Sequence, residues 1–207
     1  MNKFTRLISV LAISFSMLAS MAFAQPIEVV NAQLELTQEQ QSYNWNPLQG
    51  DWIIVNVERN TLQFVREDNS KTSAPIDIGS GKMGGPINYL GMNYVPATPE
   101  DVWEVQSLHQ QNWFNVFGSQ ESDEQLFMRL YRVRGEERIY SHYGIHTVPN
   151  IDELLDTNDG FNSWGCVLTK YQTLKFLEYI YSLNGGVLKV VTTKQNTSDV
   201  LNLVNNF

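Results

Sequence analysis

Residues 127–146 read FMRLYRVRGEERIYSHYGIH, and this stretch predicts two consecutive strands. Apolar and polar residues alternate from 127 to 133, and a second strand is predicted over 139–146. Further short strand patterns, separated by turn residues, lie at 52–57, 61–65, 75–79, 102–105 and 187–192. Repeated short strands favour a β-sandwich or barrel-like domain over alternating β/α units. We therefore expect a mostly β fold.

One helical pattern interrupts the strands. Thr169 and Gln172 have the spacing of a capping box. The apolar residues that follow recur at helical intervals (Leu174, Leu177, Ile180, Tyr181 and Leu183), and Asn184-Gly185-Gly186 ends the pattern. A second, short amphipathic helix is predicted over 198–204. The expected architecture is a β-sandwich with one or two helices.

The first 24 residues have the pattern of a signal peptide. Lys3 and Arg6 precede an apolar stretch over 7–19, and Ala22-Phe23-Ala24 has the small-x-small form that signal peptidase cleaves. Gln25 stands where a lipid-anchored protein would have Cys, and no later segment reaches the ~20 apolar residues of a membrane helix. We expect export across the inner membrane into a periplasm, without a membrane span.

The remaining chain is acidic. The predicted signal peptide contains two of the 14 Lys and Arg residues and none of the 22 Asp and Glu residues, so the mature net charge is more negative than −8. This charge argues against nucleic acid and anionic membrane surfaces as partners. Residues 25–49 are rich in Gln, Glu and Asn and predict a polar leader, and residues 50–207 predict a single domain.

Cys166 is the only cysteine of the chain, and it follows His146 by twenty residues. A lone thiol is either a small buried hydrophobe or a nucleophile. On a strand, His142, Gly144 and His146 share one face. Cys166 precedes the predicted helix, and both a helix N-terminus and an imidazole lower the pKa of a thiol. Gly165 leaves room for a substrate carbonyl near backbone N–H groups, an arrangement that favours acyl transfer.

The motif around Cys166 carries a family resemblance. His146 is followed by sixteen residues and then by Ser163-Trp164-Gly165-Cys166. This arrangement resembles the catalytic domain of the L,D-transpeptidases, also called the YkuD domain, and the likeness extends over residues 50–193. The resemblance implies a β-sandwich that carries a cysteine acyl-transferase, acting on the stem peptides of peptidoglycan. By position, Cys166 is the nucleophile and His146 the base.

The resemblance also implies roles for neighbouring residues. A backbone carbonyl near Thr147 orients the His146 ring, and Ser163 and Gly165 shape the pocket and the oxyanion site. We expect no cofactor. Zinc is disfavoured, because His142 and His146 are four apart on a strand, whereas a zinc pair at that spacing needs a helix.

Two positions depart from the family pattern. Trp164 stands where relatives usually have His, and Leu168 stands where they commonly have Arg. Without that cation we expect a less cationic and more apolar pocket in which a free carboxylate binds poorly, because a buried unpaired charge is costly. His142 either replaces the missing imidazole or is an exposed sheet residue.

Three functions therefore stay open. The chain is a transpeptidase, a hydrolase of the same fold, or an inactive homologue that binds the cell wall. The hydrolase would be an L,D-carboxypeptidase or a peptidase on crosslinked or protein-linked stems, with a wall-linked protein as a possible partner.

Two further segments carry structural predictions. The acidic segment 150–162 is predicted to be a solvated loop or a lid, and Trp113-Phe114 is predicted to line a cleft.

Overall fold

The computed structural model describes residues 43–81, 85–89, 91–110, 126–157 and 160–204. The predicted signal peptide, most of the predicted leader and the pair Trp113-Phe114 lie outside these residues. Within the described part, no helix has the length and apolar character that crossing a membrane requires.

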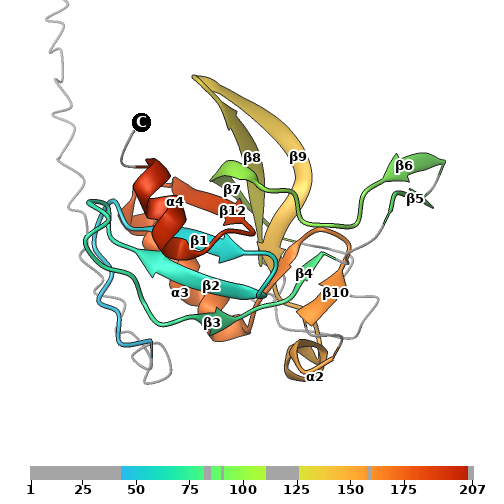
Figure 1. Cartoon of the computed structure of the whole chain (residues 1–207), viewed down its shortest axis with the longest axis horizontal. Helices are drawn as coiled ribbons and strands as arrows, with labels where there is room; N and C mark the ends of the chain where they lie inside the picture. The colour runs from blue at the N-terminus through green and yellow to red at the C-terminus, as the bar shows by residue number, and fades with distance from the viewer. Residues whose placement is uncertain (1–42, 82–84, 90, 111–125, 158–159, 205–207) are drawn as a thin grey trace, which may run out of the picture. The chain divides into compact units, whose positions relative to one another are not determined.

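The described part of the chain is built around an eight-stranded mixed sheet. Its strands are Trp52–Asn56 (β1), Thr61–Val65 (β2), Ile76–Asp77 (β3), Asp101–Gln110 (β7), Leu126–Arg134 (β8), Glu137–His146 (β9), Val167–Leu168 (β11) and Leu188–Thr193 (β12). Their order is β11-β9-β8-β7-β12-β1-β2-β3 (Figure 1). The β1–β12 and β9–β11 pairs are parallel, and the other neighbours are antiparallel. The predicted mostly β class is confirmed.

Two small sheets and three helices complete the described part. The small sheets pair Ser80–Gly81 (β4) with Phe161–Ser163 (β10), and Ile87–Tyr89 (β5) with Met92–Tyr94 (β6). The helices are Ile151–Leu155 (α2), Tyr171–Leu183 (α3) and Thr197–Val204 (α4). Helix α2 lies in the acidic segment that the sequence predicts as a loop, so that segment is partly helical.

Alternation along the strands divides the buried side chains between the two faces of the sheet. In β1, Ile53 and Val55 belong to the larger core, which includes Leu174, Phe176, Leu177 and Ile180 of α3. Trp52 and Ile54 point the other way and pack with Val65, Val191 and Val200, the last of which belongs to α4. Helices α3 and α4 therefore cover opposite faces of the β1–β2–β12 part of the sheet.

The folded domain begins earlier than the sequence pattern indicates. Trp45 is buried in the larger core, and its Nε1 donates to Asp51 Oδ2 at 2.9 Å. The Tyr43 hydroxyl hydrogen-bonds the Thr173 hydroxyl at 2.8 Å. The last residues of the stretch predicted as a leader thus pack against the domain.

The start of α3 also differs from the prediction. Thr169 is not its N-cap, because the Thr169 N–H donates to the His146 carbonyl at 3.0 Å and continues the pairing of β11 with β9. The helix begins two residues later at Tyr171, with Lys170 as an N-cap that makes no side-chain cap hydrogen bond. The capping box predicted at Thr169 and Gln172 is therefore wrong.

Candidate active site

The parallel pairing of β9 with β11 determines how the cysteine and the histidine lie. Val167 pairs with Ile145 and Leu168 with His146, so Cys166 stands next to Gly144 in the same register. Val167 and Ile145 are both buried in the core on the α3 side. Because neighbouring residues of a strand point to opposite faces, Cys166, Gly144 and His146 lie on the face away from α3. The two reactive side chains are therefore diagonal neighbours on one face.

The His146 ring is held in one tautomer. Its Nδ1 lies 2.8 Å from the Thr147 carbonyl oxygen, which can only accept a hydrogen bond. Nδ1 therefore carries the proton, and Nε2 is the nitrogen that can take one up. The ring is 4% exposed and packs beside Phe127, with 5.4 Å between the ring centroids. Burial lowers the pKa of His146 to about 4, although the Thr147 carbonyl opposes this shift.

The Cys166 thiol is neutral in this environment. Burial raises its pKa to about 11, and a hydrogen bond from the Gly144 backbone and the positive charge of Arg129 act in the opposite direction. The sequence predicts a lowered pKa, and that prediction is wrong because burial outweighs the favourable groups. Near neutral pH the site thus contains a thiol and a neutral imidazole rather than a thiolate–imidazolium pair.

Ser163 fixes the turn that presents Cys166. Its hydroxyl accepts a hydrogen bond from the Gly165 N–H at 3.1 Å and donates to the Cys166 carbonyl at 2.5 Å. Gly165 has φ of +105°, a conformation that residues with a side chain rarely adopt. Since the Gly165 N–H is engaged by Ser163, an oxyanion in this site needs another donor.

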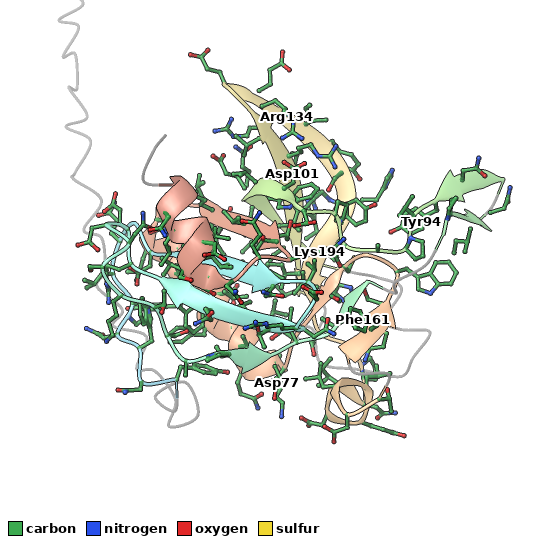
Figure 2. All side chains as sticks on the ribbon, in the orientation of Figure 1. Asp77, Tyr94, Asp101, Arg134, Phe161 and Lys194 are labelled. Carbon is green, nitrogen blue, oxygen red and sulfur yellow. The ribbon has the colours of Figure 1, made fainter. Side chains whose placement is uncertain are left out.

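A hairpin distant in sequence supports the same turn. Tyr94 is the last residue of β6 (Figure 2). It donates its hydroxyl proton to the Trp164 carbonyl. The Tyr143 ring lies so close to Gly165 that a Cβ there would overlap it. The Trp164 side chain is 45% exposed. Sequence reasoning missed Tyr94, because nothing in the β5–β6 segment marks it as a neighbour of the cysteine.

Arg129 was also missed, although the alternation of β8 places it on the same face as Phe127. Its guanidinium lies 4.8 Å from the Phe127 ring centroid and 4.9 Å from that of Tyr140. One of its N–H groups donates to the Ser141 carbonyl at 2.9 Å. Arg129 is thus a cation whose charge acts on the Cys166 thiol from a different strand, whereas the expectation of a less cationic pocket was based on Leu168 alone.

His142 lies on the same face of β9 as His146, and each of the two is two positions from Gly144. It is exposed, and its ring packs edge-on against Tyr140 with 5.5 Å between centroids. A role for His142 as a second imidazole at Cys166 stays a prediction. Among the described residues, no three His, Cys, Asp or Glu side chains converge as metal ligands would.

Comparisons with known proteins give likenesses of fold. No protein-family model matches the chain, and no curated protein sequence matches it. Among solved structures, Bd1075 of Bdellovibrio bacteriovorus matches at 16% identity and a TM-score of 0.48, over 77% of this chain and 54% of that one. An L,D-transpeptidase from Xylanimonas cellulosilytica matches at 17% identity and a TM-score of 0.45, over 75% of this chain and 68% of that one.

An Enterococcus faecium L,D-transpeptidase matches at 18% identity and a TM-score of 0.43, over 70% of this chain and 50% of that one. The chain thus spans about half the length of the first and third of these proteins. Two of the three are L,D-transpeptidases, the family that the sequence motif resembles. At these identities and TM-scores, the likeness carries no information about the activity of this chain.

Proposed function

We propose that this protein is an exported cysteine acyl-transferase that acts on peptidoglycan stem peptides, in the manner of an L,D-transpeptidase. The observation that carries the proposal is the β9–β11 register, which sets Cys166 and His146 on one face with Gly144 beside the sulfur. The substrate class and the export come from the sequence, through the motif around Cys166 and the signal-peptide pattern of residues 1–24.

The geometry supports general-base attack by the thiol. As Cys166 Sγ bonds to the substrate carbonyl carbon, His146 Nε2 takes the thiol proton, and Nδ1–H stays on the Thr147 carbonyl. The tetrahedral intermediate collapses as the leaving amine takes that proton from His146. An acyl thioester remains on Cys166. An incoming amine or water then gives its proton to His146, attacks the thioester, and regenerates the thiol.

Digestion of purified sacculi tests the proposal. Mature protein is incubated with sacculi, with and without an added D-amino acid, and the muropeptides are resolved by mass spectrometry. A transpeptidase incorporates the added amino acid or forms new crosslinks, and a hydrolase shortens stems or opens crosslinks. Both activities should vanish in Cys166→Ala. Equal muropeptide profiles for the wild type and this variant, with co-sedimentation of both, would establish a non-catalytic wall-binding protein instead.

A further inference from the structure

The arginines of the β8–β9 hairpin are not equivalent. Three of the four pair with carboxylates: Arg132 and Arg134 with Asp101, at 2.7 Å each, and Arg138 with Glu104, at 2.5 Å. Arg129 has no carboxylate partner among the described residues. It is instead half-buried between two aromatic rings, which orient its guanidinium without neutralising it. Within the part of the chain that the structure describes, this cation has no counter-ion, so it is able to bind an anionic group of a substrate.

The strand register aims this cation at the reaction centre. Arg129 pairs with Gly144, and Gly144 stands next to Cys166, so the three residues form a row across β8, β9 and β11. The outer two Cα atoms of such a row are about 10 Å apart. The Phe127 ring covers Gly144 in this row, so closely that a Cβ on Gly144 would overlap it, and the Arg129 guanidinium packs 4.8 Å from the centroid of that ring. The effect of the Arg129 charge on the thiol agrees with this closeness.

The donors of Arg129 are sufficient for a carboxylate. A guanidinium has five N–H donors, and one of them is engaged by the Ser141 carbonyl. Two parallel N–H groups bind a carboxylate in the bidentate geometry that favours arginine over lysine. An extended peptide advances ~3.5 Å per residue. Arg129 is therefore placed to bind a carboxylate within about two residues of the carbonyl that Cys166 attacks.

We propose that Arg129 binds a carboxylate of the peptide substrate next to the scissile bond, and so selects anionic stem peptides over their amidated forms. This inference rests on the proposed function, because it assumes that the substrate is a stem peptide. It also reverses the expectation from Leu168: the cation absent after Cys166 in the sequence is supplied from β8.

Binding to a chemically inactive variant tests the inference without turnover. In a Cys166→Ala background, calorimetry measures the affinity for a stem tetrapeptide and for derivatives in which one carboxylate at a time is converted to a carboxamide. One amidation should weaken binding about 10- to 100-fold, as expected for a charge-assisted bidentate pair. Arg129→Gln should weaken binding of the unmodified peptide by the same factor as this amidation does. In the Arg129→Gln variant, the same amidation should then cause no further loss of affinity.

Two further variants control for charge and folding. Arg138→Gln removes the same charge at the far end of the hairpin and should leave every affinity within about twofold. Arg129→Lys keeps the charge but loses the bidentate geometry, and should give an intermediate affinity. The inference is overturned if the losses from Arg129→Gln and from each amidation simply add, or if none of the amidations weakens binding. If carboxylate-dependent binding is found but the wild type turns over no stem peptide, the proposed function fails and the role of Arg129 stands.

Discussion

Alkylation of Cys166 as a function of pH tests the neutral state of the thiol. Burial raises its pKa from 9.0 to about 11, and only the thiolate reacts with iodoacetamide. Near pH 7 the thiolate fraction falls tenfold for each unit of pKa, so Cys166 should react about a hundredfold more slowly than an unperturbed thiol. The rate should rise about tenfold per pH unit and level off only around pH 11. Because the chain has one cysteine, every adduct in the intact mass reports on this site.

The same protein in urea provides the unperturbed reference, since denaturation removes the burial that causes the shift. Arg129→Gln removes the nearby positive charge and should raise the pKa of Cys166 further, so that alkylation slows again. A rate that is already at its plateau near pH 7 would refute the reasoning. It would show that the folded site contains a thiolate–imidazolium pair in spite of its burial.

The remaining predictions concern the base and the turn. His146→Asn keeps a hydrogen-bond donor toward the Thr147 carbonyl but removes the base, so kcat/KM should fall about 10²- to 10⁴-fold. A variant that retains a tenth of the wild-type activity would contradict the mechanism. In the wild type, kcat/KM should stay constant as the pH falls from about 8 to about 5. The reason is that burial lowers the pKa of His146 to about 4 and keeps the imidazole neutral over this range. A decline of kcat/KM centred near pH 6.5 would show that the pKa of His146 is not shifted. Gly165→Ala forces a side chain into a backbone with φ of +105° and against the Tyr143 ring. It should lower the free energy of unfolding by about 2–4 kcal/mol in urea titrations, and an unchanged midpoint would exclude this conformation.

Much of the fold could be predicted from local pattern. The strands β1, β2, β8 and β9 lie within two residues of their predicted bounds, because alternation along a strand directly reflects which side chains are buried. Pairing could not be predicted in the same way. β12 enters the sheet between β1 and β7, and β11 joins its edge beside β9, through contacts between residues far apart in the chain.

The start of α3 shows why a local signal failed. Thr169 and Gln172 have capping-box spacing, but the backbone of Thr169 is already bonded to His146 as an extension of β11. A residue whose backbone continues a strand pairing cannot also be the N-cap that accepts hydrogen bonds from the first free N–H groups of a helix. Because Thr169 pairs with β9, the helix begins only at Tyr171. The same pairing sets the partly buried Cys166 beside Gly144 of β9, and burial raises the pKa of its thiol.

The position of Arg129 near the Cys166 thiol could not be predicted from the sequence, for a related reason. Its place beside the thiol depends on a register across three strands, and the β8–β9 pairing shifts between Arg129 and Tyr131. Counting back from the turn of the hairpin without this irregularity gives the wrong partner for Arg129. Its position has a consequence for the chemistry. A carboxylate bound to Arg129, as we propose, would cancel the charge that favours the thiolate and would make the neutral thiol still more stable. In the proposed mechanism, proton removal by His146 would then accompany the attack on the carbonyl rather than precede it.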